Sequence, residues 1–303
     1  MEKWDCAIVG GGAAGMSAAL QLARARKSVV VFDNNTNRNR VTQESHGFLT
    51  RDGITPAQFR EEARHDLAKY PNVTFVSAEV TSIMKQMITA NFQVGTNNHP
   101  YLAEKVLLAT GIRESFPRVP SIGSFYGKSI FSCPYCDGYE RKDEPLILFA
   151  ETEAGILHMG KTLLNWTGDL VIASNGNKLA GDTISLFEKH GVRIEQARVT
   201  ELIGENGMLQ EVVFENEKRI KRSGGFVIPQ FVRKDSFAAD LGCMFDEEGK
   251  LITEASGQTS IPHVYAAGEY VNQAPSSLLL AAAEGARVAT NMNLHFVEAR
   301  FFS

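Results

Sequence analysis

The chain has 303 residues, of which 44% are hydrophobic and 22% are charged, and this is an ordinary composition for a globular protein. Its length suggests about two domains. Lysine and arginine number 31 against 35 acidic residues, which gives a formal net charge of −4. Because the balance is slightly acidic and no basic tract occurs, we expect no nucleic-acid partner.

Neither the start of the chain nor its apolar runs indicate export or membrane insertion. The first residues carry acids and lead directly into an apolar stretch, unlike a signal peptide. The longest apolar run near the C-terminus, 278–283, is far too short to span a bilayer. Only two of the four cysteines lie close together, unlike the pattern of a secreted disulfide framework. We therefore expect a cytoplasmic protein with no membrane partner.

Strand and helix signals alternate along the chain. Short apolar runs predict strands, and apolar residues at helical spacing predict the helices between them. The predicted strands are 6–9, 28–33, 105–108, 146–149, 169–174 and 263–267. The first predicted helix begins at a glycine-rich turn and ends at Leu22, and the others cover 56–70, 155–165 and 281–289. This alternation is typical of α/β proteins with parallel sheets.

Prolines mark two places where we expect the chain to cross between domains. Pro117 and Pro120 follow the third predicted strand, and Pro229 lies between the predicted strands 169–174 and 263–267. We therefore predict two Rossmann-like three-layer domains. One is discontinuous and is formed by residues 1–115 and 234–303; the other, smaller domain, 116–233, is inserted in it and carries the two neighbouring cysteines.

The turn after the first strand has the glycine pattern of a dinucleotide site. Gly10 permits a tight turn, Gly12 lets a pyrophosphate approach the backbone, and Gly15 allows the helix to pack closely on the strand. Asp33 ends the next strand, where a carboxylate accepts from ribose hydroxyls. The alternative for the glycines is a turn that binds no ligand. The alternative for Asp33 is a side chain that caps a helix or faces solvent. The predicted dinucleotide-binding residues here are Gly10, Gly12, Ala13, Ala14, Gly15 and Asp33.

Cys133 and Cys136 are separated by two residues, a spacing that favours a small redox-active disulfide ring. Pro134 between them stiffens this ring. A zinc site would need more ligands, and no second Cys-x-x-Cys occurs, while a static disulfide is the other alternative. Cys6 and Cys243 stand alone in apolar surroundings and are predicted to be small core residues.

Four segments together resemble a known family. The turn at 10–15, Ala-Thr-Gly at 109–111, Cys-Pro-Tyr-Cys-Asp-Gly at 133–138 and Tyr-Ala-Ala-Gly at 265–268 resemble low-molecular-weight thioredoxin reductase, in the correct order over nearly the whole chain. The segments 45–49 and 136–140 are closer to a side branch of gliotoxin-type dithiol oxidases and diflavin-linked disulfide oxidoreductases. The resemblance implies FAD in the discontinuous domain, a homodimer, and a cysteine pair that faces the flavin.

The resemblance also implies a role for each residue of the cysteine motif. Cys136 would be the thiol nearest the flavin, and Cys133 the one that meets the substrate. Asp137 would manage protons at the dithiol, a role that needs its pKa raised by burial; the alternative is that it caps the following turn. The substrate would be a disulfide or dithiol, on a thioredoxin-like protein or a small molecule.

Further flavin contacts are implied with two departures from the family pattern. Glu269 stands where the family usually has aspartate, and Ser276-Ser277 where it often has Arg-Gln. The helix after Pro275 would point its N-terminus at the flavin. His46 is a flavin-loop or substrate-side candidate, or else a structural histidine. The implied FAD-binding residues outside the first turn are Ala109, Thr110, Gly111, Gly268, Glu269 and Ser277.

The largest departure concerns the electron donor. In thioredoxin reductase a second glycine-rich turn binds NADPH, but here Ala150 and Thr152 replace the glycines at its first and third positions, and Glu151 and Glu153 add negative charge. The segment 174–177 after the next strand offers no arginine for a 2′-phosphate. We therefore expect impaired NADPH binding, with ferredoxin or a second flavin as the donor.

We accordingly predict a FAD-dependent thiol–disulfide oxidoreductase that passes electrons between flavin and substrate through the cysteine pair. Three alternatives stay open: an NADPH-dependent thioredoxin reductase, a dithiol oxidase that uses oxygen, and a non-catalytic redox-sensing flavoprotein. We predict no metal site.

Overall fold

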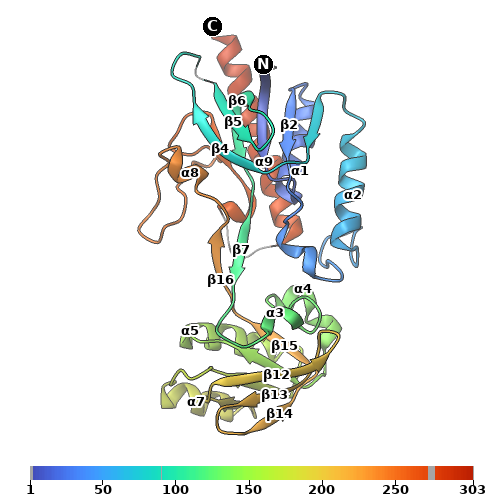
Figure 1. The fold of residues 1–303 in the computed structure, drawn as a ribbon, viewed down its shortest axis with the longest axis vertical. Helices are drawn as coiled ribbons and strands as arrows, with labels where there is room; N and C mark the ends of the chain where they lie inside the picture. The colour runs from blue at the N-terminus through green and yellow to red at the C-terminus, as the bar shows by residue number, and fades with distance from the viewer. Residues whose placement is uncertain (1–2, 90, 272–276, 303) are drawn as a thin grey trace. The chain divides into compact units, whose positions relative to one another are not determined.

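The computed structural model describes residues 3–89, 91–271 and 277–302 and divides the chain into two compact units (Figure 1). The first unit contains Met1–Arg40, Pro56–Arg113 and Val232–Ser303, and the second contains Val41–Thr55 and Glu114–Phe231. Both are mixed α/β structures built on parallel sheets, which confirms the predicted fold class.

The first unit is built on a seven-stranded sheet. Six of its strands follow the order β3-β2-β1-β6-β5-β4, and the seventh, β17, pairs with β6. The strands β1, β2, β3, β6 and β17 are parallel, whereas β5 pairs antiparallel with both β4 and β6. The strands are β1 Lys3–Val9, β2 Val29–Phe32, β3 Val73–Val76, β4 Val80–Lys85, β5 Phe92–Thr96, β6 Tyr101–Leu108 and β17 Val264–Ala266.

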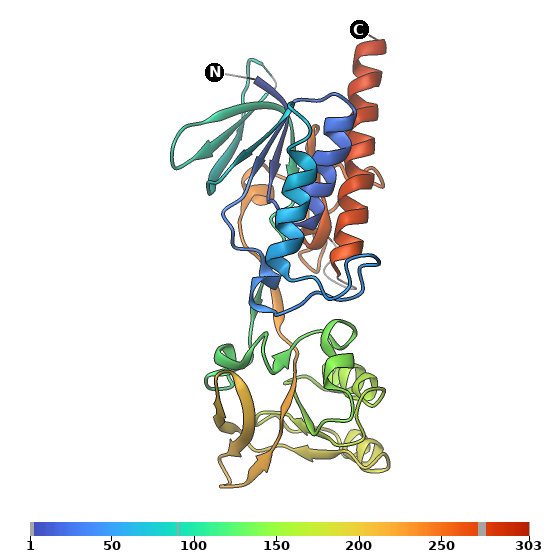
Figure 2. The same ribbon diagram turned by 90° about the vertical axis from the view of Figure 1, so that its right-hand side faces the viewer.

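Alternate residues of the central strands serve two separate cores. Cys6 and Ile8 of β1 pack with apolar residues of helices α1, α2 and α9, which Figure 2 shows side by side. Ala7 and Val9 pack on the opposite face against residues of β4, β5 and α8. This alternation follows from the two-residue period of a strand. The helical segments of this unit are α1 Ala13–Arg24, α2 Pro56–Leu67, α8 Phe237–Asp240, η4 Gly268–Tyr270 and α9 Leu278–Phe301.

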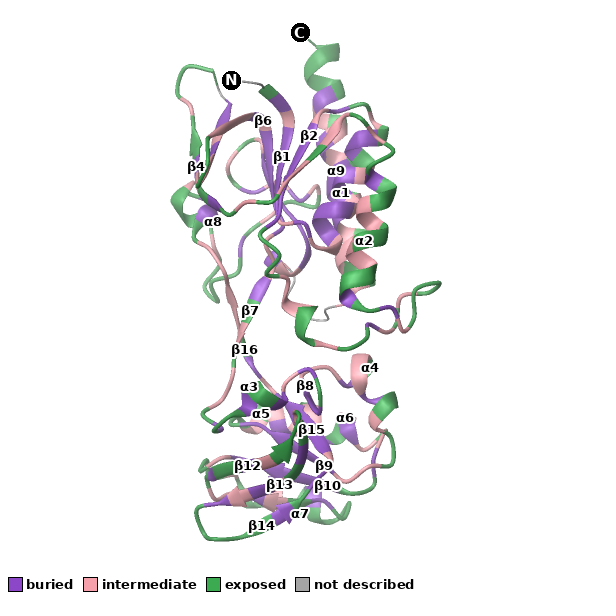
Figure 3. Cartoon of the chain, turned by 45° about the vertical axis from the view of Figure 1, so that its right-hand side comes forward, coloured by how far each residue is buried: buried purple, intermediate pink, exposed green. Residues whose placement is uncertain are grey.

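The second unit contains a parallel sheet with the order β11-β10-β9-β15-β8, and an antiparallel sheet of β12, β13 and β14. The strands β9, β10 and β15 are buried throughout, as Figure 3 shows, which explains why β9 and β10 are continuous apolar runs in the sequence. The strands are β8 Ile130–Phe131, β9 Leu146–Phe149, β10 Leu170–Ala173, β11 Arg193–Glu195, β12 Val199–Glu205, β13 Met208–Phe214, β14 Arg219–Lys221 and β15 Gly224–Val227.

Short helical segments complete the second unit. The segments are α3 Ile122–Phe125, α4 Pro134–Asp137, η2 Tyr139–Arg141, α5 Glu153–Gly155, the π-helical η3 Ile156–Gly160, α6 Lys161–Leu163 and α7 Gly181–Glu188. The segments η3, α6 and α7 pack on one face of its parallel sheet, and the antiparallel sheet packs on the other face together with α3. The 3₁₀ segment η1 Arg38–Val41 ends where the loop Val41–Thr55 begins.

The chain passes between the units through two strands that pair with each other, β7 Ile112–Ser115 and β16 Gln230–Arg233. These crossings lie beside the prolines that marked them in the sequence. The loop Val41–Thr55 groups with the second unit, although it lies within the range 1–115 expected to form the first domain. The reason is tertiary: the carbonyl of Val41 lies so close to Gly127 that a Cβ there would approach it within 2.4 Å.

Two further features of the described residues concern the helices and the free cysteines. Within the described residues, no helix is long and apolar enough to cross a membrane. Cys6 and Cys243 are free and buried, which confirms that they are core residues. Burial raises the pKa of both thiols, so neither is a ready nucleophile.

Candidate active site

The glycines of the first turn are required for two different structural reasons. Gly10 has φ +115°, and a Cβ there would lie 2.2 Å from the carbonyl oxygen of Ala109. A Cβ on Gly15 would lie 1.9 Å from the carbonyl oxygen of Gly10. A Cβ on Gly12, in contrast, would meet no protein atom within 4 Å. Two glycines are therefore needed for packing, whereas Gly12 leaves the backbone open to a ligand.

Helix α1 begins directly at this opening. Gly12 is its N-cap residue and supplies no side-chain cap for the first amides, while Ala13 and Ala14 form the start of the helix. The uncapped amides and the positive end of the helix dipole are the donor set that binds pyrophosphate. The geometry fits the phosphate part of a dinucleotide, and cofactor binding at these positions stays a prediction.

Asp33 follows β2 and lies against the same turn, because a Cβ on Gly11 would approach its Oδ2 within 2.7 Å. Its carboxylate is nearly buried and accepts from the guanidinium groups of Arg60 and Arg64, the latter at 2.8 Å. The Asn35 amide donates to its other oxygen at 3.0 Å. The two arginines were missed in the sequence, although their spacing of one turn on the predicted helix 56–70 was a usable signal.

The predicted residues of the 109–111 and 268–269 segments come together at the carboxyl ends of β6 and β17, which pair in parallel. Gly111 and Gly268 have φ of +70° and +72°. A Cβ on Gly111 would lie 3.9 Å from Glu269 Oε2. Parallel strands place their carboxyl ends at one edge, where open α/β sheets bind ligands. Glu269 is therefore positioned at the edge that carries the first glycine turn.

Glu269 has an ionic partner that the sequence did not indicate. Arg38 Nη2 lies 2.5 Å from Glu269 Oε1, and Arg38 Nε lies 3.3 Å from Oε2. Thr110 donates a hydrogen bond of 2.5 Å to Asp235, which also accepts from the Tyr270 hydroxyl at 2.9 Å. These long-range contacts fix the polar side chains of this edge.

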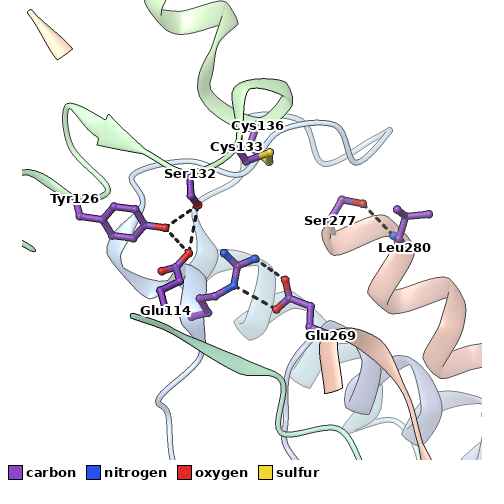
Figure 4. Close-up of a disulfide and its surroundings, with 9 residues drawn as sticks. Glu114, Tyr126, Ser132, Cys133, Cys136, Glu269, Ser277 and Leu280 are labelled. Carbon is purple, nitrogen blue, oxygen red and sulfur yellow. Dashed lines mark hydrogen bonds and ion pairs between the residues drawn. A yellow bond between two sulfur atoms is a disulfide. The ribbon is translucent and has the colours of Figure 1, made fainter. Parts of the chain in front are cut away.

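Ser277 is the N-cap residue of α9. Its hydroxyl oxygen accepts from the Leu280 amide at 3.1 Å, so it fixes the start of the helix (Figure 4). The neighbouring Pro275 and Ser276 lie outside the described residues.

Cys133 and Cys136 form a disulfide in the second unit, with a Cα–Cα distance of 5.3 Å. Cys133 is the N-cap residue of α4, and its carbonyl accepts from the amides of Cys136 and Asp137, both at 3.1 Å. Tyr135 between the two cysteines is 81% exposed and packs edge-to-face on Trp166. The half-buried sulfur pair thus lies on a short, hydrogen-bonded turn.

Asp137 is half-buried and is the last residue of α4. The N-cap residue of the next turn, η2, is Gly138. A Cβ on Gly138 would approach the Trp166 ring within 3.0 Å, so the backbone after Asp137 is held tightly against that ring. Its role as proton donor and acceptor stays a prediction.

Ser132, directly before Cys133, belongs to a hydrogen-bonded group that sequence reasoning missed. Its hydroxyl lies 2.8 Å from that of Tyr126 and 3.2 Å from Glu114 Oε1. The Tyr126 hydroxyl also donates to Glu114. In Figure 4 the three side chains point toward one another beside the disulfide. No local sequence pattern marks this group, because its members come from three separate elements.

His46 also lies in the second unit and is surrounded by carboxylates. Its Nε2 lies 3.4 Å from Glu44 and 3.6 Å from Glu140, and its Nδ1 lies 3.5 Å from Asp52. The Gly47 amide, aided by the nearby imidazole, lowers the pKa of Asp52. The imidazole is only 18% exposed. Among the described residues, no cluster of His, Cys, Asp and Glu side chains could hold a metal ion.

The turn after β9 differs from the first glycine-rich turn. Thr152 is the N-cap residue of α5, and its side chain accepts from the Gly155 amide at 3.2 Å. Gly12, at the corresponding place in the first unit, provides no such side-chain cap. The turn therefore uses its own hydroxyl where a phosphate would bind.

The two glutamates of this turn are held by neighbouring side chains. Glu151 accepts from the Asn175 amide group at 2.8 Å, and Glu153 accepts from the Thr183 hydroxyl. One cation that the sequence did not indicate lies nearby, since a Cβ on Gly176 would approach Arg198 within 2.7 Å. The turn is negatively charged, and the arginine lies at the loop after the next strand.

The family follows from comparison with known proteins. The sequence model of the pyridine nucleotide-disulphide oxidoreductases matches residues 4–157 and 162–285. The chain belongs to this family. It is a flavin-dependent disulfide oxidoreductase, and the family implies FAD as its cofactor.

Individual relatives confirm the resemblance to thioredoxin reductase. The crystal structure of a putative thioredoxin reductase from Bacillus anthracis has a TM-score of 0.96 and 46% identity, covering 98% of this chain and 99% of that one. Thioredoxin reductase tcpT of Claviceps purpurea is 28% identical over 88% of this chain and 86% of its own length. A probable thioredoxin reductase of Arthroderma benhamiae is 37% identical over 48% of this chain, and the match spans only 37% of that protein.

Proposed function

We propose that this protein is a FAD-dependent thiol–disulfide oxidoreductase that exchanges electrons with its substrate through Cys133 and Cys136. The observation that carries the proposal is the disulfide between these cysteines, in a family member whose first unit has an open glycine turn. When bound, FAD supplies two-electron exchange with the dithiol. The residues that would hold it are the backbone at Gly12 and the amides of α1, with Asp33 at the ribose.

The exchange needs two thiols with separate tasks. In the reducing direction, the Cys133 thiolate attacks the substrate disulfide, a mixed disulfide forms, and one substrate thiolate leaves. Cys136 then attacks Cys133, the second substrate thiol leaves, and the internal disulfide is restored. Asp137 would donate and accept the protons of these steps. The same steps in reverse oxidise a substrate dithiol.

We further propose that the direct electron donor is neither NADPH nor NADH. The support is the side-chain cap at Thr152 and the charge of Glu151 and Glu153, where a pyrophosphate would need free amides and positive potential. A ferredoxin or a second flavin would then reduce the protein. The substrate would be a disulfide or dithiol on a thioredoxin-like protein or a small molecule. We place the protein in the cytoplasm, as a homodimer.

The same turn favours a second candidate function, a dithiol oxidase that passes substrate electrons to oxygen. An oxidase needs no nicotinamide, which agrees with an impaired turn. Dithiol-dependent peroxide formation in air would distinguish it from a reductase.

Single cysteine variants test the main proposal. Cys133→Ser should leave a Cys136 thiolate and show a long-wavelength charge-transfer band with the oxidised flavin. Cys136→Ser should abolish electron transfer between flavin and substrate while FAD stays bound. If either variant turns over a disulfide substrate at the parent rate, the proposed relay is wrong.

A further inference from the structure

Three oxygens meet beside the redox pair in the second unit. The hydroxyls of Ser132 and Tyr126 lie 2.8 Å apart, and both reach Oε1 of Glu114 (Figure 4). All three side chains are half-buried. Hydrogen bonds shielded from water are stronger than exposed ones and strengthen one another. We call Glu114, Tyr126 and Ser132 the hydroxyl–carboxylate group.

The members of this group are held by their own elements. Glu114 lies on β7, and Tyr126 follows α3 and donates its amide to the Ile122 carbonyl at 3.0 Å. The Tyr126 ring packs on Phe116 with centroids 4.5 Å apart. Ser132 follows the buried strand β8. These contacts restrict the position of the Tyr126 hydroxyl. Ser132 therefore hydrogen-bonds to a group that is already held in place.

Ser132 is bonded directly to Cys133, so fixing the Ser132 side chain also restricts the position of the Cys133 backbone. Cys133 has an extended backbone, φ −131° and ψ 107°, and its carbonyl starts the turn that carries Cys136. One end of the turn is thus fixed by the serine side chain. The other end of the turn is fixed at Gly138, whose backbone packs closely against the Trp166 ring.

We propose that the hydroxyl–carboxylate group positions the Cys133–Cys136 segment and shifts its equilibrium toward the disulfide. This inference rests on the proposed thiol–disulfide function. Reduction opens the ring and releases two cysteines that only the backbone then holds together. An anchored segment keeps them close, so reoxidation requires less loss of conformational freedom. These three residues are positioning residues that act through Cys133.

The test is the dithiol–disulfide equilibrium of the FAD-loaded protein. The protein is equilibrated without oxygen in mixtures of reduced and oxidised dithiothreitol, quenched in acid, and its free thiols are alkylated and counted by mass. Ser132→Ala and Tyr126→Phe should each shift the equilibrium toward the dithiol about tenfold, equivalent to about 30 mV for two electrons. Ser132→Thr keeps the hydroxyl and should stay near the parent value.

Two matched controls remove hydroxyls elsewhere in the same unit. Tyr139→Phe and Ser124→Ala lie at exposed positions outside the group, and both should leave the equilibrium unchanged. If Ser132→Ala and Tyr126→Phe match the parent while the parent exchanges normally, the inference is overturned and the proposed function stands. A parent pair that never exchanges with dithiothreitol overturns the proposed function and the inference together.

Discussion

At the scale of single residues, the glycines of one motif divide into packing positions and a binding position. Side chains at Gly10 or Gly15 would collide with backbone oxygens at 2.2 and 1.9 Å, whereas one at Gly12 would enter free space. A substitution at Gly12 therefore separates cofactor binding from folding. The other two positions cannot do this, because their variants would disturb both.

Gly12→Val should fold and lose most of its affinity for FAD. The valine would keep the pyrophosphate from the amides of α1, and losing two charge-assisted hydrogen bonds of about 1.5 kcal/mol each weakens binding about 100-fold. Flavin absorbance of the purified protein and titration of apoprotein with FAD measure this. The matched comparison is Gly15→Val, which we expect to lower the melting temperature as well. Full flavin retention in a well-folded Gly12→Val variant would remove the basis for placing FAD at this turn.

At the scale of elements, two similar strand–turn–helix motifs differ in how the first amides of their helices are capped. Helix α1 starts without a side-chain cap, whereas α5 is capped by Thr152 and flanked by glutamates that neighbouring side chains hold. A side-chain cap satisfies an amide that a phosphate would otherwise accept from. We therefore expect the two elements to differ in anion affinity, although both follow a buried parallel strand.

Neither NADPH nor NADH should reduce the flavin efficiently. Thr152 already accepts from the Gly155 amide, and Glu151 and Glu153 add two negative charges, so we expect nucleotide binding to weaken toward the millimolar range. Stopped-flow mixing without oxygen measures flavin bleaching, with reduced ferredoxin or a flavin donor run in parallel. A double variant, Thr152→Gly with Glu153→Ala, should speed reduction by NADPH. Bleaching within seconds at sub-millimolar NADPH in the parent protein contradicts the prediction.

The packing of α9 on α1 also depends on one small residue. A Cβ on Gly285 would lie 2.0 Å from the carbonyl oxygen of Ala14, a backbone atom that cannot move aside. Gly285→Val should therefore destabilise the first unit by about 3 kcal/mol, as overpacked core variants do. Urea denaturation measures it, and Gly123→Val, with no atom within 4 Å, is the control. Equal stability of the two variants would show that the helices can separate without loss.

At the scale of the whole molecule, the two compact units carry different parts of the proposed chemistry. The first unit has the open glycine turn, and the second has the disulfide and the capped turn. Each unit has its own apolar clusters on both faces of a parallel sheet. Ligand binding to one unit can therefore be followed separately from the other.

FAD should protect the first unit from opening. A ligand at a hundred times its Kd stabilises the state that binds it by about 2.7 kcal/mol, which slows hydrogen exchange through that opening about 100-fold. Mass spectrometry of apoprotein and FAD-loaded protein should show this slowing in peptides of α1 and α2. Peptides of β12 and β13 serve as the internal control. Slowing confined to β9 and α5 would mean that the flavin binds the second unit instead.

Local pattern was enough to predict the α/β class, the first glycine turn and the cysteine pair. Strand and helix periods are properties of short segments, and Gly15, Cys133 and Cys136 each have their closest partner within a few residues of chain. The predicted helix 281–289 was too short, since α9 covers Leu278–Phe301. Its buried face continues through Met292 and Phe296, which are large and lie outside the small-residue pattern that marked the helix.

Only the tertiary structure decided which side chains hold the functional ones in place. Arg38 and Glu269 are 231 positions apart, Arg60 reaches Asp33 over 27, and Ser132 reaches Glu114 over 18. Such contacts depend on how strands and helices are arranged, and no local period records them. The sequence by itself therefore determined the chemistry that the chain carries. The fold determined the partners of its charged and hydroxyl groups, because these meet only after distant segments have packed together.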